Sequence, residues 1–207
     1  MAKSLSYTYI DSGAMYRAVT LYLLRQDLLK NDGIPAIEKA LEEINIHFQI
    51  INDIPHTMLN GQNVEEEIRQ MEVSQNVSTV AAISAVRKKL VHIQQHLGIN
   101  KGVVMDGRDI GTVVFPNAEL KLFLTADLET RTKRRLEELL EKGIQVEERT
   151  VKENLRSRDF IDSTREDSPL HQAEDAILVD NTYLSRAEQL EKALHYAQQI
   201  ISGASSQ

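Results

Sequence analysis

The sequence predicts a single α/β domain in which helices cover both faces of a parallel sheet. Short apolar segments at 7–11, 103–106, 120–124 and 176–180 alternate with longer segments of helical periodicity, an order typical of parallel strands joined by helices. Hydrophobic residues make up 42% of the 207 residues and Trp is absent, so we expect a core of aliphatic side chains. An Asn-Gly hairpin signal adds a small antiparallel insertion to this plan.

The first strand runs directly into a helix. Ser12 is a suitable N-cap, and Met15, Val19 and Tyr22 recur behind it at helical spacing. We expect the turn residues Asn-Asp-Gly at 31–33 to end this helix. A second, short helix is predicted over 34–44.

An antiparallel piece follows the second helix. Residues 46–51 are rich in β-branched side chains, and the segments 57–59 and 62–64 flank the pair Asn60-Gly61. Because an Asn-Gly pair suits the tight turn of a two-residue loop, the sequence predicts a hairpin here.

The second half of the chain returns to alternating helices and strands. We predict a long helix over 74–97, the strand that ends at Asp106, and a strand over 120–124 after which Asp127 opens a helix over 128–142. The remaining expectations are a polar, Arg-rich segment to Pro169, a last strand over 176–180, a closing helix capped by Ser185 and an unstructured tail over 202–207.

Composition and charge exclude several classes of function. The net charge of −7 opposes a general attraction to nucleic acid or to an anionic membrane, so an anion site has to be local. The chain has no Cys, no apolar stretch long enough to span a bilayer and no secretory signal pattern, and we expect a cytoplasmic protein. An arginine-rich RNA-binding module is disfavoured because no aromatic stacking platform accompanies the arginines.

The segment that follows the strand at 103–106 carries groups suited to a phosphorylated ligand. Asp106 can orient a Mg²⁺ shell at the carboxyl end of a strand, Gly107 lets the backbone turn, and Arg108 offers a planar fork to phosphate oxygens. The plainer interpretation is a loop in which Arg108 and Asp109 pair with each other or with their neighbours.

The helix start after the first strand is a second candidate for anion binding. Free backbone N–H groups there are joined by Arg17, although an ordinary helix cap followed by a surface arginine would give the same pattern. Because both segments occur at the carboxyl ends of strands in one chain, we favour a binding site over two separate structural features.

A third cluster is a stretch rich in basic residues after the strand at 120–124. Its members are Arg131, Lys133, Arg134, Arg135, Arg149, Arg156, Arg158 and Arg165. Interleaved acidic residues allow a solvated helix face with i,i+4 pairs. The alternative is a mobile lid that closes cations over a transferring phosphoryl group.

His92 and His96 have the i,i+4 spacing of metal ligands, but no third ligand lies near them in the sequence. We therefore interpret them as surface residues and predict no metal site built by side chains alone.

With these residues in hand, the chain resembles the bacterial cytidylate kinases, nucleoside monophosphate kinases with a P-loop kinase fold. The resemblance rests on Asp-Ser-Gly-Ala-Met-Tyr-Arg at 11–17 and Asp-Gly-Arg-Asp-Ile-Gly-Thr-Val-Val-Phe-Pro at 106–116, and it extends over essentially the whole length. It implies one kinase domain spanning residues 1–207, with a monophosphate-binding region and its antiparallel insertion at about 34–97 and an Arg-rich lid at about 127–169.

The resemblance also implies roles for individual residues. Those that would bind CMP are Arg17, Arg108 and Arg165 at the phosphate, Ser12, Arg158 and Asp162 at the ribose, and Ser78, Arg87 and Asp109 at the edge of the cytosine. Those that would serve catalysis are Asp106 near Mg²⁺ and the transferring phosphoryl group, Arg108, and the lid residues Arg131, Arg134 and Arg135 facing ATP.

The reaction implied by the resemblance is transfer of the γ-phosphoryl group of ATP to CMP, with dCMP as a second substrate. The products would be CDP or dCDP, and ADP. The enzyme would use Mg²⁺, act as a monomer and have small molecules as its partners rather than nucleic acid or membrane.

The sequence departs from the family pattern at one motif. The family carries an N-terminal strand followed by Gly-x-x-x-x-Gly-Lys-Ser/Thr, and no such loop occurs in the sequence; Lys3-Ser4 resembles the late part of the helix that follows it. One hypothesis is a cytidylate kinase sequence that starts late, in which case codons upstream of Met1 encode the strand and the loop. The other is a catalytically inactive protein that binds CMP without phosphorylating it.

Overall fold

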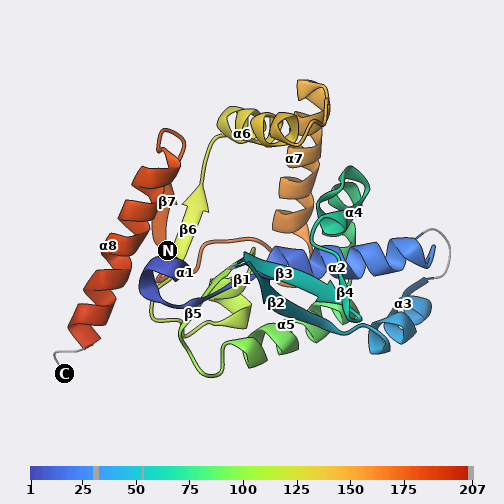
Figure 1. The fold of residues 1–207 in the computed structure, drawn as a ribbon, viewed down its shortest axis with the longest axis horizontal. Coiled ribbons are helices and arrows are strands. Elements are labelled where there is room, and N and C mark those ends of the chain that lie inside the picture. Colours follow the sequence, from blue (N-terminus) through green and yellow to red (C-terminus); the bar gives the residue numbers. More distant parts are fainter. Residues whose placement is uncertain (30–32, 53, 205–207) are drawn as a thin grey trace.

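Two parallel strand pairs frame the fold, and helices surround them (Figure 1). The computed structural model describes residues 1–29, 33–52 and 54–204. β1 (Thr8–Asp11) pairs with β5 (Val103–Asp106), and β6 (Leu122–Thr125) pairs with β7 (Ile177–Asp180), both in parallel. The predicted α/β class with parallel strands is confirmed. The pairs do not form one sheet, because no strand among the described residues joins β5 to β6.

The helix α2 (Ser12–Arg25) begins where β1 ends. Its N-cap is Asp11 rather than the predicted Ser12, since the Asp11 carboxylate accepts a hydrogen bond from the Ala14 N–H at 2.9 Å. The Ser12 hydroxyl is therefore free to donate elsewhere, and it donates to the backbone carbonyl of Asp106 at 2.6 Å.

The end of α2 differs from the prediction. The helix stops at Arg25, and Gly33 of the predicted terminating turn instead begins α3 (Gly33–Glu42). Asn31 and Asp32 of that turn lie outside the described residues.

The predicted hairpin is confirmed. β2 (Ile46–Ile51) pairs antiparallel with β3 (Ile54–Leu59), which pairs in turn with β4 (Gln62–Asn63). Asn60 and Gly61 form the turn with φ values of 48° and 80°, as a turn with two positive φ angles requires. A short 3₁₀ helix, Glu67–Arg69, leads from this sheet back toward α2.

The helix predicted over 74–97 is two helices. α4 (Met71–Ala81) and α5 (Ser84–Leu97) are separated at Ile83, whose backbone is extended (φ −77°, ψ 117°). The apolar periodicity continues across the break and conceals it. The Arg87 side chain donates to the carbonyl of Ala81 at 3.1 Å, which satisfies one of the acceptors at the end of α4.

The C-terminal half contains the helices α6, α7 and α8, of which the first two follow β6. Asp127 caps α6 (Leu128–Glu141) as predicted, and α7 (Glu148–Thr164) forms within the Arg-rich segment. In Figure 1 the chain leads from β6 up to α6 at the top of the view, and α7 runs down next to α6 and α4. No helix in the described part of the chain has the length and apolar character needed to cross a membrane.

The closing helix α8 (Arg186–Ala204) begins with a capping box. The Glu188 N–H donates to the Ser185 hydroxyl at 3.2 Å, and the Ser185 N–H donates to the Glu188 carboxylate at 2.8 Å. The predicted tail is wrong for 202–204, which belong to α8, and residues 205–207 lie outside the described part. Two short helical segments complete the described elements, α1 (Ala2–Leu5) and a π-helical turn, Ile110–Val114, after β5.

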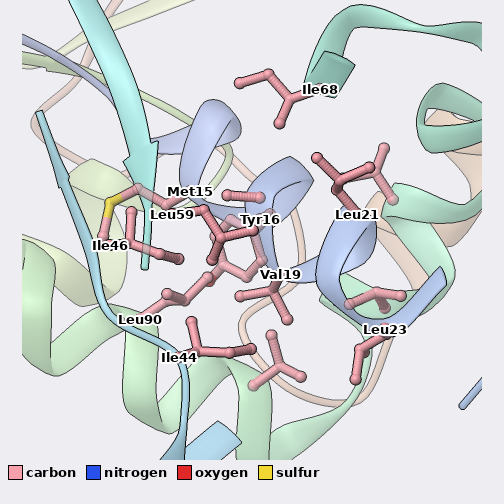
Figure 2. Packing of buried hydrophobic residues seen from close by; sticks show 14 of the residues in the cluster. Met15, Tyr16, Val19, Leu21, Leu23, Ile44, Ile46, Leu59, Ile68 and Leu90 are labelled. Carbon is pink, nitrogen blue, oxygen red and sulfur yellow. The ribbon is translucent and has the colours of Figure 1, made fainter. Parts of the chain in front are cut away.

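The main hydrophobic core surrounds α2 (Figure 2). Met15, Val19 and Leu23 are fully buried on this helix, and Leu59 from β3 and Leu90 from α5 pack against them. Burying such side chains contributes about 1.5–3 kcal/mol each. The N-terminal turns of α2, which carry Ser12 and Arg17, are therefore held on a rigid element.

Candidate functional site

A pocket opens between the first turns of α2, the loop after β5, the helices α4 and α5, and α7. Its lining residues are Ser12, Gly13, Tyr16, Arg17, Val77, Ser78, Ala81, Arg87, Gly107, Arg108, Asp109, Arg158, Asp162 and Arg165. Every residue predicted to bind CMP is in this set, although the residues are spread along the chain between positions 12 and 165. The fold thus brings these predicted residues together in one place.

The floor of the pocket is where β1 and β5 end. The two strands are in register so that Asp11 lies beside Asp106, and the hydroxyl of Ser12 bridges to the Asp106 carbonyl. Gly107 is required at this crossing, since a Cβ atom there would collide with the Ser12 hydroxyl and the side chain of Ile110.

One wall holds a buried ion pair. The Arg87 guanidinium pairs with the carboxylate of Asp109, and the two side chains are only 4% and 3% exposed. The guanidinium also lies 5.5 Å from the centre of the Tyr16 ring, in cation–π geometry. A planar donor and a carboxylate are thereby fixed side by side in the lining of the pocket.

A second group of charged side chains in the lining is centred on Asp162 from α7. Its carboxylate accepts from Arg108 Nε at 3.1 Å and lies 3.6 Å from Arg165 Nη1. Arg165 additionally donates to the Ser168 carbonyl through Nε and Nη2, at 3.0 and 2.8 Å. The Asp162 carboxylate therefore lies between the guanidinium groups of Arg108 and Arg165, both of which line the pocket.

The pocket is strongly cationic within an acidic protein. Its lining includes five arginines and two carboxylates. Burial and the neighbouring cations Arg158, Arg69 and Arg135 lower the pKa of Arg17 to about 10. Burial, together with Arg108, lowers the pKa of Arg158, whose buried Nε has no hydrogen-bond partner among the described residues. Guanidinium groups crowded together in this way fit an anionic ligand.

Asp106 lies at the edge of this arrangement and not among the lining residues. The Tyr9 hydroxyl donates to its carboxylate at 2.9 Å. The residue as a whole is exposed, but partial desolvation of its carboxylate and the adjacent Asp11 carboxylate raise the pKa of Asp106, whereas the Tyr9 hydrogen bond and Arg108 act in the opposite direction. The Asp11 carboxylate is itself occupied, because it caps α2 and pairs with Arg69 at 2.8 Å, so Asp106 is the carboxylate of the two that could face a hydrated divalent cation.

The predicted lid residues lie outside the pocket and are held by neighbouring groups. Arg131 pairs with Asp159 at 2.7 Å, and Arg135 pairs with Glu138 at 2.7 Å. The Arg134 guanidinium donates to the Asn181 side chain and carbonyl at 2.9 and 2.7 Å. Arg131 thus joins α6 to α7 and Arg134 joins α6 to the loop after β7, whereas the pair of Arg135 lies within α6 itself.

The family model for cytidylate kinase matches residues 1–199. The chain belongs to the cytidylate kinase family. This family consists of kinase enzymes, and the mixed α/β fold with parallel strands described above agrees with its architecture.

Relatives named cytidylate kinase match most of the chain. One from Parabacteroides distasonis is 52% identical over 193 residues, which cover 91% of this chain and 84% of the relative. Another, from Flavobacterium johnsoniae, is 49% identical over 205 residues, covering 97% of this chain and 89% of the relative. A third, from Phocaeicola vulgatus, is 50% identical over 207 residues, covering 98% and 90%.

Several residues in or behind this pocket were missed from the sequence. Tyr16 stacks against Arg87, Tyr9 holds the Asp106 carboxylate, and Ser74 accepts a hydrogen bond from Arg17. A signal existed for Ser74, because it precedes Ser78 by four residues and so lies on the same face of a helix. Tyr9 and Tyr16 could not be assigned without the pairing of β1 with β5 and the path of α5.

Proposed function

We propose that this protein transfers the γ-phosphoryl group of ATP to CMP, and also to dCMP, giving CDP or dCDP and ADP. The observation that supports this most is the pocket itself, in which five arginines and two carboxylates line one cavity. The family membership supports the reaction class, and the relatives that match the chain are named cytidylate kinase.

In this proposal the phosphate of CMP binds to the cationic part of the pocket. Arg17, Arg108 and Arg165 present guanidinium groups to its oxygens, which is the geometry that phosphate favours. Arg158 adds a fourth cation from α7. The pairing of Asp162 with Arg108 and Arg165 leaves that carboxylate able to accept from ribose hydroxyls, together with Ser12.

The cytosine would lie against the buried wall. The Asp109 carboxylate can accept from the exocyclic amino group, and Arg87 and Ser78 can donate to the ring nitrogen and carbonyl. UMP carries a carbonyl where CMP carries the amino group, so it would oppose Asp109. We therefore propose selectivity for cytosine over uracil at this wall.

Transfer requires an in-line attack by a CMP phosphate oxygen on the γ-phosphorus of ATP. The new P–O bond forms as the bond to the β,γ-bridging oxygen breaks, and ADP leaves without a covalent enzyme intermediate. The arginines stabilise the negative charge that spreads over the transferring group. We assign Arg131, Arg134 and Arg135 to ATP through closure of the α6–α7 region, which is the proposed lid at about 127–169.

The residues beside the pocket fit Mg²⁺ as a cofactor. Asp106 offers its carboxylate beside Asp11, whose own two oxygens are already bound, Oδ1 by the Ala14 N–H at 2.9 Å and Oδ2 by Arg69 at 2.8 Å. A single available carboxylate fits an ion that keeps several waters and relies on substrate phosphates with one or two carboxylates. When bound, Mg²⁺ would neutralise charge on the ATP phosphates. Asp106 would hold its water shell.

A coupled assay of the 207-residue protein tests the proposal directly. CMP with ATP and Mg²⁺ should give CDP and ADP, UMP should react far more slowly, and calorimetry should detect CMP binding. Arg165→Met should weaken CMP binding by at least about tenfold, whereas Arg149→Met, at an arginine on α7 whose side chain is 85% exposed, should leave it unchanged.

The same experiment separates the alternatives. CMP binding without CDP formation in a folded protein would favour the CMP-binding protein without kinase activity. Absence of CMP binding would overturn the proposed site. The monomeric state, the cytoplasmic location and the domain boundaries stay predictions.

A further inference from the structure

Arg17 is held in place from behind the pocket. The residue lines the pocket, and its Nη1 atom donates to the Ser74 hydroxyl at 2.8 Å and to the Ile68 carbonyl at 3.3 Å. Ser74 is 2% exposed and does not line the pocket. The hydroxyl therefore contacts the guanidinium from the protein interior, not from the ligand side.

This anchoring matters because the surroundings of Arg17 repel it. Arg158, Arg69 and Arg135 all act on Arg17 as like charges, and burial opposes its charge as well. An unanchored guanidinium in such a place would move toward water. Two neutral acceptors hold it against this repulsion.

The neutrality of these acceptors is itself informative. A carboxylate in the place of Ser74 would hold Arg17 more strongly, but it would neutralise the charge and compete with a phosphate ligand. A hydroxyl and a backbone carbonyl hold one Nη atom and leave the positive charge available to the ligand. The arrangement therefore orients the Arg17 guanidinium toward the pocket without neutralising its charge.

One face of α4 carries two buried serine hydroxyls, one in the lining of the pocket and one behind it. Ser74 and Ser78 are one helical turn apart, and both are buried, at 2% and 3% exposure. Ser78 lines the pocket, whereas Ser74 lies behind Arg17. One face of α4 therefore contacts both the pocket, through Ser78, and Arg17, through Ser74.

We propose that Ser74 is a positioning residue, which fixes Arg17 for recognition of the phosphate of the nucleoside monophosphate without touching the nucleotide. The inference rests on the proposed function for the identity of that ligand. Ser74 is not among the residues that the family resemblance implies as CMP ligands. We expect it to affect only the part of the binding affinity that depends on the phosphate.

Calorimetry with CMP and cytidine separates positioning from a general structural role. Ser74→Ala should weaken CMP binding about tenfold, and binding of cytidine, which lacks the phosphate, should stay within about twofold. Ser74→Cys, which preserves the volume but is a weak acceptor, should lower CMP affinity in the same selective way. Thr20→Val is the matched control, since it removes another fully buried hydroxyl from the core of α2, where Thr20 donates to the Tyr16 carbonyl.

A double-mutant cycle completes the test. Arg17→Met alone should lower CMP affinity more than Ser74→Ala does, and adding Ser74→Ala to it should cause no further selective loss. Equal losses for CMP and cytidine, or no loss in Ser74→Ala, would overturn the inference alone. An Arg17→Met variant with an unchanged ratio of CMP to cytidine affinity would overturn the proposed phosphate site and the inference with it.

Discussion

The Ser12 hydroxyl donates to the backbone carbonyl of Asp106 at 2.6 Å and so joins two residues that are 94 positions apart in the sequence. This bond closes the floor of the pocket where β1 and β5 end. Asp11, the residue before Ser12, caps the helix by accepting from the Ala14 N–H. A change at this crossing should therefore affect both the fold and the ligand site.

Gly107→Ala tests the close approach between Gly107 and Ser12 at the ends of β5 and β1. The new Cβ would occupy the position of the Ser12 hydroxyl and contact Ile110, so we expect a loss of roughly 1–3 kcal/mol in the free energy of unfolding. CMP affinity should also fall. Denaturant unfolding and calorimetry measure the two effects. Gly203→Ala is the control, because a Cβ at Gly203 meets nothing within 4 Å, and unchanged stability in Gly107→Ala would contradict the packing described.

Asp109→Asn tests the buried ion pair. The substitution leaves the Arg87 guanidinium buried without its counter-charge, and we expect a loss of roughly 3–5 kcal/mol in the free energy of unfolding. Glu119→Gln removes the partner of Lys101 in a pair whose side chains are 60% and 80% exposed, and it should change stability by less than about 0.5 kcal/mol. Similar effects in the two variants would show that burial does not govern the Arg87 pair.

Arg158→Met should raise the stability of the ligand-free protein while weakening its binding of CMP. Burial and the nearby Arg108 lower the pKa of Arg158, which means that its charge disfavours the folded state at pH 7. The variant should unfold at a midpoint higher by about 2 °C or more without ligand and gain less from added CMP. Arg156→Met on the exposed side of α7 is the control. A lower midpoint without ligand would contradict the prediction.

Asp106→Asn should have a pH-dependent effect on stability. Because the pKa of Asp106 is raised in the folded protein, its contribution to stability is complete below the pKa of the unfolded chain and is lost as pH rises through the folded pKa. The variant should therefore be more stable than the parent near neutral pH. This difference should shrink as pH falls toward 4.

Thermal unfolding of both proteins between pH 4 and pH 8, in buffer with a chelator, measures the Asp106 effect. The Tyr9 hydroxyl can still donate to the amide oxygen of the variant, so the hydrogen bond is preserved in the comparison. A difference that grows toward acid pH would show that the carboxylate stabilises the fold.

Local signals in the sequence predicted the elements whose causes are local. The Asn60-Gly61 turn and the Asp127 cap depend on a few adjacent residues, and both occur as predicted. The choice between Asp11 and Ser12 as cap was not local, because it is decided by the register of β1 against β5. The break at Ile83 was missed because the apolar spacing passes through it without interruption.

For the site, resemblance to a family selected residues that the fold then places around one pocket. Physical patterns alone could not have done this, since the residues come from several segments that are distant in the sequence. The anchoring of Arg134 to the loop after β7 had no sequence signal, because it uses backbone carbonyls. Side chains that act through a neighbour, such as Ser74, become visible only when the neighbour is located.

The break between α4 and α5 has a consequence for selectivity. In an uninterrupted helix the carbonyl of Ala81 would accept from the backbone four residues later, and it would be unavailable to the Arg87 side chain. Arg87 would then lose one of the contacts that immobilise it beside Asp109. A straightened helix would gain regular backbone bonding yet loosen Arg87, the group proposed to distinguish cytosine from other bases. The selectivity proposed for this wall therefore relies on the interruption at Ile83.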